Sequence, residues 1–362
     1  MSMHELGVEE YTWKQLLNQL VRGHELNSDQ ITWAMDQIMT GATEEPIIAS
    51  FLTALHTRGE TPAELGALAA GMLAKAQSVD IDPNAVDIVG TGGDQQNTVN
   101  ISTMAALVIA GAGVTVVKHG NRASTSKSGS ADVLEALGIR LDMPVERVAQ
   151  CAQETGITFL FAQVFHPSMR FVGPVRRLLG IPTAFNYLGP MTNPARVHHS
   201  AIGVANERMA PKIAQVFAER GDHALVFRGD DGLDELTING TSRVWEAVDG
   251  TLVERVFDPA EFGFEYAPLE TLRGGDAQHN AGVFRAILSG AGASASVEDA
   301  VFAPIREAVL INAAAALVAS RPVDGEEFSV RFERALADAR TSIDSGAAAA
   351  VLQKWIDFSN AE

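Results

Sequence analysis

Three glycines and an aspartate lie close together at Gly90–Asp94, directly after an apolar run of residues. Glycines at the end of a strand let backbone N–H groups approach an oxyanion, and the helix that follows adds its positive end. The spacing matches neither a P-loop nor the dinucleotide motif G-x-G-x-x-G. It predicts either an anion-binding loop or a tight turn. Asn100–Thr103 follows and offers side-chain donors and hydroxyls that suit Mg²⁺. The alternative is an ordinary helix N-cap.

Positive charge and hydroxyl groups gather in a second segment. Lys118–Arg122 contains a lysine, a histidine, an asparagine and an arginine. Hydroxyl-bearing and basic residues follow at Ser124, Thr125, Ser126, Lys127, Ser128 and Ser130. Cations and hydroxyls around glycines are typical of a phosphate-binding loop. A solvated surface loop is the alternative, and the overall acidity of the chain makes it the weaker one.

Arginines and turn-forming pairs mark a third segment. His166–Arg170 is followed by Arg176-Arg177 and then by Asn186–Pro194. Because arginine forms bidentate pairs with carboxylates, Arg170 or Arg176 is suited to orient an acidic substrate. Surface ion pairs and simple turns explain the same residues equally well.

Adjacent carboxylates form the fourth segment, Asp230–Glu235. Acids that follow a strand suit Mg²⁺, a hard cation that takes oxygen ligands and is often shared with substrate phosphates. The segment is not an EF-hand loop, because no glutamate stands at the twelfth position from Asp230 or Asp231. An Asx-type turn is the alternative.

The elements that must position these segments begin with helices. Apolar residues repeat at helical spacing from Trp13, and N-cap residue types at Asn27–Asp29 start a second helix. A third helix is predicted from Thr43 to Gly59, and Thr61–Glu64 has the pattern of a capping box. Residues 1–80 are therefore expected to form a small helical domain, joined by helices from about 168–190. The composition of Asp80–Asn84 is that of a linker.

Short β-rich runs alternate with helices beyond this linker. Strands are predicted at Val86–Val89, Val114–Val117, Ile157–Ala162, Ala201–Val204 and Ala224–Phe227. Gln163–Arg170 is expected to be a loop, Thr237–Phe257 to add antiparallel strands, and helices to return from Asn280. The predicted class is α/β, with a mainly parallel central sheet flanked by helices over residues 85–362. Ligands bind at the carboxyl ends of such strands, so the four segments are expected to share one crevice.

Composition excludes several classes of partner. The 362 residues hold 27 Lys+Arg and 45 Asp+Glu, a net charge of −18, which argues against nucleic acid or an anionic membrane as a partner. The lone cysteine, Cys151, is predicted to be a small core residue. Met1–Tyr11 lacks the pattern of a secretory signal, and the apolar stretch Met104–Val117 is too short to span a bilayer. A soluble, cytoplasmic protein is expected.

Together and in this order, these segments resemble the anthranilate phosphoribosyltransferases of tryptophan biosynthesis. The resemblance covers nearly the whole chain. It is carried by Gly90–Asp94, Asn100–Thr103, Lys118–Arg122, Ser128–Asp132, Leu134–Gly138, His166–Arg170, Phe185–Pro194, Asp231–Glu235, Gly274–Asp276, Asn280-Ala281 and Asn312–Ala314.

The resemblance implies a reaction and the parts that perform it. The phosphoribosyl group of 5-phosphoribosyl-1-pyrophosphate (PRPP) passes to the amine of anthranilate, and pyrophosphate is released. A homodimer formed through the helical domain and two Mg²⁺ ions per subunit are implied, with Ser102, Asp234 and Glu235 as metal ligands. No essential acid or base is expected, and His119 is the one candidate.

The resemblance also implies contacts residue by residue. The expected PRPP contacts are Gly90, Gly93, Asp94, Thr98, Asn100, Ile101, Ser102, Thr103, Lys118, Ser126 and Ser130. The expected anthranilate contacts are Gly90, His119, Asn121, Arg176, Gly189 and Pro190. The chain departs from the family at Gln95-Gln96, where glycine is frequent, and side chains there are expected to stiffen or narrow the PRPP loop.

Three other functions fit parts of the pattern. A pyrimidine nucleoside phosphorylase shares the lysine–serine loop, but it needs no paired carboxylates at Asp234-Glu235. A non-catalytic relative that binds nucleic acid needs a basic face, which the net charge opposes. A phosphoribosyltransferase for another aromatic acceptor remains open, because a small apolar pocket rejects near-isosteres weakly.

Overall fold

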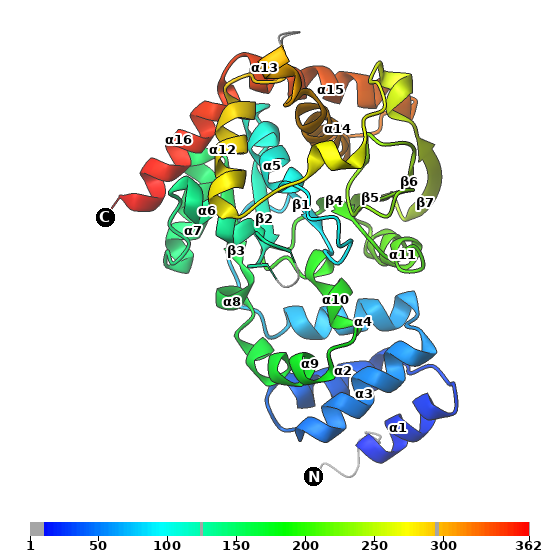
Figure 1. Cartoon of the computed structure of the whole chain (residues 1–362). Coiled ribbons are helices and arrows are strands. Elements are labelled where there is room, and N and C mark those ends of the chain that lie inside the picture. The colour runs from blue at the N-terminus through cyan, green and yellow to red at the C-terminus, as the bar shows by residue number, and fades with distance from the viewer. Residues whose placement is uncertain (1–10, 124–125, 294–296, 362) are drawn as a thin grey trace. The chain divides into compact units, whose positions relative to one another are not determined.

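The computed structural model describes residues 11–123, 126–293 and 297–361 (Figure 1). Ser124 and Thr125 of the second segment, and residues 1–10 of the segment predicted to lack a secretory signal, lie outside the described residues. The described chain forms two compact units. One comprises the residues up to Ala76 together with His166–Thr192, and the other comprises Gln77–Phe165 and the residues from Asn193 onward.

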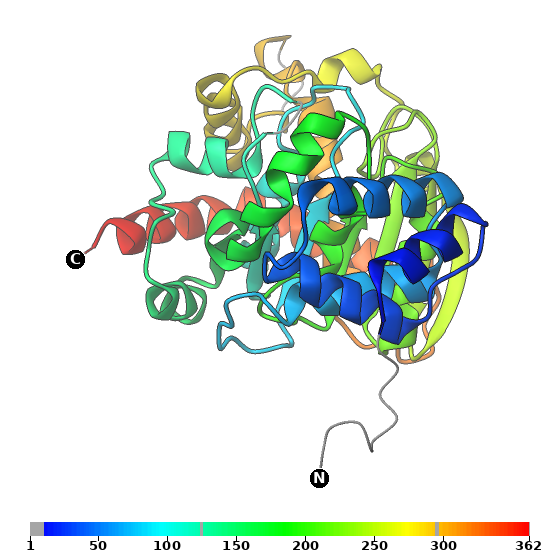
Figure 2. The ribbon, with the colours of Figure 1, turned by 90° about the horizontal axis from the view of Figure 1, so that it is seen from below.

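The first unit is helical, as the sequence predicts. Its helices are α1 (Trp13–Val21), α2 (Ser28–Met39), α3 (Glu45–Arg58), α4 (Pro62–Leu73), α9 (Gly173–Leu179) and α10 (Phe185–Leu188). Helix α1 packs on α3, and α2 packs on α4 (Figure 2). The predicted N-cap at Asn27 and the capping box at Thr61 and Glu64 are confirmed. The ring of Trp13 lies 5.5 Å from that of Phe51, so apolar burial joins α1 to α3.

The second unit is built on one sheet. Its strands are β1 (Val86–Gly90), β2 (Val116–Gly120), β3 (Ile157–Phe161), β4 (His199–Gly203), β5 (His223–Gly229), β6 (Ser242–Val248) and β7 (Thr251–Phe257). Among the described residues the seven strands run in the order β3-β2-β1-β4-β5-β6-β7. Strands β1 to β5 pair in parallel, and β6 and β7 are the predicted antiparallel additions.

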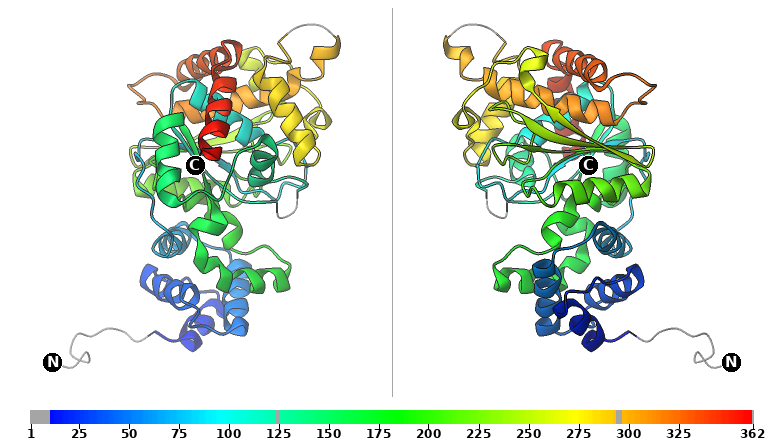
Figure 3. Two further views of the ribbon diagram at one scale, coloured as in Figure 1. Left: turned by 90° about the vertical axis from the view of Figure 1, so that its left-hand side faces the viewer. Right: turned by 90° about the vertical axis from the view of Figure 1, so that its right-hand side faces the viewer.

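Helices cover both faces of this sheet. They are α5 (Ile101–Gly111), α6 (Ser130–Leu137), α7 (Val145–Thr155), α8 (Ala162–Phe165), α11 (Ala210–Arg220), α12 (Ala277–Leu288), α13 (Val297–Ala300), α14 (Ala303–Ala319), α15 (Phe328–Asp344) and α16 (Ala347–Asn360). Helix α14 packs on β4 and β5 from one face, and α11 packs on β5 to β7 from the other (Figure 3).

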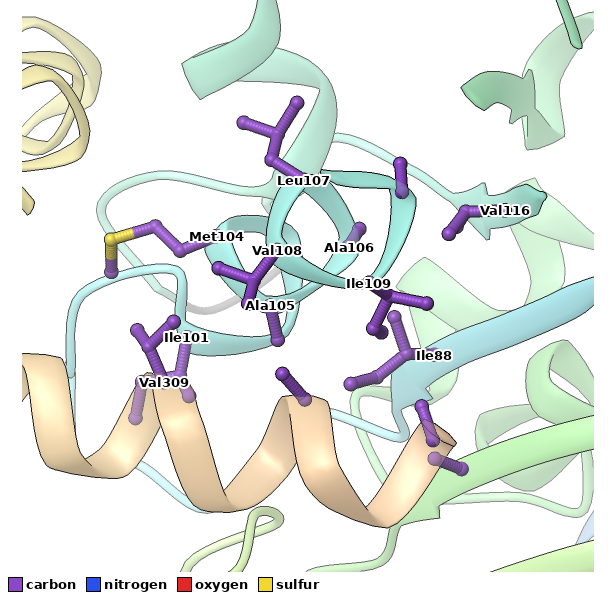
Figure 4. Packing of buried hydrophobic residues seen from close by; sticks show 14 of the residues in the cluster. Ile88, Ile101, Met104, Ala105, Ala106, Leu107, Val108, Ile109, Val116 and Val309 are labelled. Atoms are coloured by element: carbon purple, nitrogen blue, oxygen red, sulfur yellow. The ribbon is translucent and has the colours of Figure 1, made fainter. Parts of the chain in front are cut away.

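The core between α5, α14 and the sheet is mainly apolar. Ile101 on α5 faces Val309 on α14, and Ile109 lies beside Ile88 of β1 (Figure 4). Cys151 is buried in the same cluster, which confirms its predicted role. This packing fixes where α5 begins, and therefore where its first turn meets the loop that follows β1.

Two local predictions need correction. Gln163–Arg170 is not a loop: α8 ends at Phe165, and Pro167–Phe171 forms a short 3-10 helix with proline at its first position. Strand β2 begins at Val116 rather than Val114, because it takes its register from Ile157 of β3. No described helix is both long enough and apolar enough to cross a membrane.

Candidate active site

The loops that carry the predicted chemistry emerge where the strand order reverses. Strands β1 and β4 are neighbours, and the chain proceeds outward from them in opposite directions. Loops diverge at such a switch point and leave a crevice outside the carboxyl ends of the strands. Gly90 ends β1 and pairs with Gly203, which ends β4. The acidic loop, Asp230–Glu235, follows the next strand, β5.

The glycine loop, Gly90–Asn100, needs its glycines for two separate reasons. Gly92 and Gly93 have φ angles of 70° and 87°, in the left-handed region that glycine adopts without strain. Gly90 needs room instead, because a Cβ there would collide with the Asp234 carboxylate. A Cβ on Gly203 would collide with the Asp234 backbone carbonyl. Because neither strand end carries a side chain at these glycines, the acidic loop has room to pack against both.

The first two acids of the acidic loop are structural. Asp231 accepts hydrogen bonds from the Leu233 backbone N–H at 3.1 Å and from the Thr237 hydroxyl at 2.7 Å. Asp230 accepts one from the Thr241 hydroxyl. An Asx-type turn therefore describes this half of the loop.

The second two acids face the glycine loop and the start of α5. Asp234 accepts a hydrogen bond from the Gly92 backbone N–H at 2.7 Å. Glu235 accepts one from the Ser102 backbone N–H at 3.2 Å. Both carboxylates are buried. Two chain segments more than a hundred residues apart thus meet in one place.

Burial makes this acid group electrostatically costly. It raises the pKa of Asp234 to about 7, and the charge of Asp94 adds to the effect. Burial also raises the pKa of Glu235 to about 8, where the charge of Asp234 adds and that of Lys118 opposes. The pKa of Asp94 is raised by burial as well. Three acids in one water-poor place favour a bound cation.

Lys118 lies beside these acids as an internal counter-charge. Its Nζ donates to the Ile88 carbonyl and, at 3.3 Å, to the Ser102 hydroxyl. Burial lowers the pKa of Lys118, and the charges of Asp87, Glu235 and Asp234 oppose that change. The ammonium group of Lys118 is therefore buried, next to Ser102, a predicted metal ligand.

Asp87 holds the strand that carries Lys118. It accepts hydrogen bonds from the His119 backbone N–H at 3.1 Å and from Asn193 Nδ2 at 2.9 Å. Burial raises the pKa of Asp87 to about 6. Sequence reasoning missed this residue, although an acid inside an otherwise apolar strand is a signal that could have found it.

Hydrogen bonds tie the loop from Asn121 to Ser130 to the glycine loop and to itself. Asn100 Nδ2 donates to the Ser128 carbonyl at 3.0 Å, so Asn100 does not cap α5 with its side chain. The Ser130 hydroxyl donates to the Asn121 carbonyl at 3.1 Å. Arg122 pairs with Asp132 at 3.0 Å and with Glu135 at 2.5 Å. This arginine, one of the cations of the predicted phosphate loop, is already neutralised by α6.

The other predicted PRPP residues differ in what they present. Ile101 and Thr103 are buried in the first turn of α5, so their side chains belong to the core. Ser126 is exposed, and its hydroxyl donates to the Ser128 carbonyl at 3.3 Å. Thr98 forms a β-bridge with Arg273. Gln95, with a φ of 61°, adopts the left-handed conformation that glycine tolerates best.

The predicted anthranilate residues are divided between the units. Gly90, His119 and Asn121 belong to the α/β unit. Arg176 lies on α9 of the helical unit, where its Nη2 donates to Asn186 Oδ1 at 3.4 Å and burial lowers its pKa. Gly189 and Pro190 form a 3-10 turn directly after α10.

The residues present fit a magnesium ion. Among the described residues no three His, Cys, Asp or Glu side chains form a metal cluster. The predicted set instead combines two carboxylates, Asp234 and Glu235, with the Ser102 hydroxyl, which leaves positions for substrate phosphates and water. Oxygen-only donors of this kind are what Mg²⁺ prefers. Burial first and repulsion between neighbouring acids second raise the pKa values of both residues, and a bound cation would favour their ionised forms.

A buried asparagine on α14 holds the acidic loop from behind. Asn312 Oδ1 accepts from the Leu236 N–H at 2.9 Å, and its Nδ2 donates to the Leu236 carbonyl at 3.0 Å. Leu236 directly follows Glu235. The sequence marked Asn312 as part of the resemblance but gave it no role, because its partner lies 76 residues away.

Two domain models of a known family match successive parts of the chain. The glycosyl transferase family, helical bundle domain, matches residues 14–76, and the glycosyl transferase family, a/b domain, matches residues 82–349. The fold and the site thus define a two-domain glycosyl transferase.

Relatives narrow this class. The chain is 60% identical over 346 residues to the anthranilate phosphoribosyltransferase of Arthrobacter sp. (strain FB24), covering 95% of each chain. It is similar to the crystal structure of anthranilate phosphoribosyltransferase from Thermus thermophilus, at 39% identity and a TM-score of 0.86, covering 96% of this chain and 99% of that one. The enzyme from Saccharomyces cerevisiae in complex with PRPP and Mg is 30% identical, with a TM-score of 0.84, covering 97% and 98%. The chain belongs to the anthranilate phosphoribosyltransferase family.

Proposed function

We propose that this chain transfers the phosphoribosyl group of PRPP to the amine of anthranilate and releases pyrophosphate. The observation that carries the proposal is the meeting of the acidic loop and the glycine loop, through Asp234 with Gly92 and Glu235 with Ser102. That arrangement places backbone donors and metal-ligating acids around one crevice. Neither a nucleoside phosphorylase nor a nucleic-acid-binding relative calls for paired acids there.

PRPP binds, in this proposal, over the first turn of α5. The proposed contacts are Gly90, Gly93, Asp94, Thr98, Asn100, Ile101, Ser102, Thr103, Lys118, Ser126 and Ser130. Ile101 and Thr103 contribute through their backbone, since their side chains are buried. The N-terminal end of α5 supports this placement, because the positive end of the helix dipole attracts phosphate.

Two Mg²⁺ ions per subunit complete the site. Ser102, Asp234 and Glu235 are the proposed ligands, supported by the buried carboxylates and their raised pKa values. When bound, Mg²⁺ neutralises charge on the departing pyrophosphate. The positive charge of Mg²⁺ also allows PRPP, an anion, to bind to a protein with a net charge of −18.

The proposed anthranilate contacts are carried by backbone turns and by polar side chains. They are Gly90, His119, Asn121, Arg176, Gly189 and Pro190. The half-buried guanidinium of Arg176 supports a role in holding the carboxylate of anthranilate, since arginine pairs with carboxylates in bidentate fashion.

Catalysis in this scheme needs no strong base. The bond from ribose C1 to pyrophosphate breaks with positive charge on the sugar and negative charge on the leaving group. The aromatic amine of anthranilate is already neutral at pH 7, so it attacks without prior deprotonation. Backbone N–H groups of the glycine loop stabilise the leaving group, and the site aligns the amine with C1. His119 is the one candidate for accepting the proton that the amine loses.

A homodimer formed through the helical unit and a cytoplasmic location belong to the same proposal. Val21 and Leu178, both apolar and strongly exposed on that unit, support a contact between copies there. The buried free thiol of Cys151 is consistent with a reducing compartment. Sedimentation of the purified protein tests the dimer, and a monomer at micromolar concentration contradicts it.

Loss of anthranilate fluorescence tests the reaction directly. Purified protein with PRPP and Mg²⁺ is expected to consume anthranilate, and a chelator is expected to stop it. Parallel reactions with other aromatic amines test the acceptor, and one with a pyrimidine nucleoside and inorganic phosphate tests the phosphorylase alternative. Turnover without PRPP, or a faster reaction with another amine than with anthranilate, contradicts the proposal.

A further inference from the structure

A segment from the C-terminal half of the chain packs against the last residues of the glycine loop, Asn97–Val99. The Val99 N–H donates to the Leu272 carbonyl at 2.9 Å, and the Gly274 N–H donates to the Asn97 carbonyl at 2.8 Å. A Cβ on Gly274 would crowd the Thr98 carbonyl, so glycine is required for this close approach. The segment Leu272–Gly275 then leads directly into α12.

Asn280, in the first turn of α12, continues this contact with its side chain. Its Oδ1 accepts a hydrogen bond from the Gly275 N–H at 2.8 Å. Its Nδ2 donates to Asn100 Oδ1 at 2.9 Å. Asn100 Nδ2 in turn donates to the Ser128 carbonyl at 3.0 Å. A relay of four residues therefore joins α12, the glycine loop and the loop that carries the serines.

Each hydrogen bond in this relay has a defined donor and acceptor, and together they fix the orientation of the Asn100 amide. Because the Gly275 N–H occupies the oxygen of Asn280, Asn280 presents its amide nitrogen to Asn100. The oxygen of Asn100 must then face Asn280, and its nitrogen must face Ser128. An amide nitrogen carries two N–H groups. One donates to Ser128, and the other belongs to the N-cap residue of α5, over whose first turn PRPP is proposed to bind.

We propose that Asn280 is a positioning residue for PRPP: it sets the orientation of the Asn100 amide, so that an Asn100 N–H is aimed at the substrate phosphates. The inference rests on the proposed function. Asn280 itself is buried, and in this proposal it acts on the substrate only through Asn100. Without it, Asn100 Oδ1 loses its donor, and the Ser128 carbonyl alone holds the Asn100 amide.

Asn280→Ala tests this role, with PRPP affinity as the readout. We expect the Kd and the KM for PRPP to rise about tenfold, because an oriented donor is lost from a partly buried site. The kcat and the KM for anthranilate are expected to change by less than about threefold, since the acceptor residues are untouched. PRPP affinity is measured by calorimetry with Mg²⁺ and no acceptor.

A double-substitution cycle separates positioning from general stability. If Asn280 acts through Asn100, adding Asn280→Ala to Asn100→Ala changes PRPP affinity by less than about twofold. Ser342→Ala is the matched control, because it removes a buried bond of 2.7 Å from α15 to the Val108 carbonyl of α5, away from the loops. It is expected to lower the melting temperature and to leave PRPP affinity unchanged.

Each outcome decides something. Unchanged PRPP affinity in Asn280→Ala, or full additivity with Asn100→Ala, overturns the inference. If Asn280→Ala does not fold, Asn280→Ser, which is smaller but polar, carries the same cycle. Wild-type protein that binds PRPP but does not consume anthranilate contradicts the proposed function and leaves the cycle valid. Wild-type protein that does not bind PRPP overturns both.

Discussion

Replacing Glu235 with glutamine is expected to stabilise the free protein while abolishing turnover. Glutamine keeps an oxygen that accepts the Ser102 N–H, a bond of 3.2 Å in the wild type. Glutamine cannot ionise, and burial and the charge of Asp234 both disfavour the ionised form of Glu235. A residue that serves only the structure would not respond in this way, because its loss would lower stability and activity together.

The magnitude follows from the pKa. In the folded protein the pKa of Glu235 is raised to about 8 from an ordinary 4.5, so the folded state holds a proton that the unfolded chain releases. The contribution of Glu235 to the stability of the wild type therefore falls as pH rises from about 4.5 toward 8, by about 3 kcal/mol at pH 7 as an upper limit. Glutamine does not titrate. The stability gain of the variant is expected to be small near pH 4.5 and to grow with pH.

Urea unfolding in the presence of a chelator, at about pH 5 and about pH 7, measures this gain. Glu333→Gln, on the exposed face of α15, is the control and is expected to show no gain. Mg²⁺ at ten times its Kd is expected to stabilise the wild type by about 1.4 kcal/mol and the variant by less. A Glu235→Gln protein that is less stable than the wild type at pH 7 refutes this electrostatic account of the site.

Three further predictions concern other parts of the chain. Arg176→Ala is expected to raise the KM for anthranilate about tenfold in steady-state kinetics. A change confined to the KM for PRPP would show that Arg176 does not bind anthranilate. Burial acts to raise the pKa of Glu246, but His223 and two arginines outweigh it and lower that pKa to about 2. The stabilisation by these partners of Glu246 is complete above about pH 4.5 and is lost as pH falls toward 2. In urea unfolding, Glu246→Gln is therefore expected to lower the free energy of unfolding by about 3 kcal/mol at pH 7 and not at all near pH 2. Equal losses at both pH values contradict this prediction. Gly92→Ala and Gly113→Ala, both at left-handed glycines with open space around them, are expected to cost about 1 kcal/mol each, and only Gly92→Ala is expected to weaken PRPP binding in calorimetry.

Local patterns predicted most of the architecture. Caps at Asn27 and Thr61 placed two helices, and the alternation of apolar runs with helices predicted the parallel sheet. The rule that ligands bind beyond the carboxyl ends of parallel strands was enough to bring Gly90–Asp94 and Asp230–Glu235 together. Both signals are local, because they depend on residue types within a few positions of each other.

Long-range side-chain contacts were beyond the reach of such patterns. Asn312 and Asn280 find partners 76 and 180 residues away, and an asparagine in a helical pattern does not reveal that partner. The sequence predicted Arg122 as a phosphate-binding cation, but in the fold it pairs with Asp132 and Glu135. Tertiary pairing of this kind decides which charges stay available to a ligand.

Calorimetric titration of PRPP with and without Mg²⁺, into the wild type and into Asp234→Ala with Glu235→Ala, tests the central claim most directly. The wild type is expected to bind PRPP tightly only when Mg²⁺ is present. The double variant is expected to lose this dependence and to show no turnover at any Mg²⁺ concentration. Unchanged, Mg²⁺-dependent PRPP binding in the double variant would contradict the claim that the acidic and glycine loops form one site.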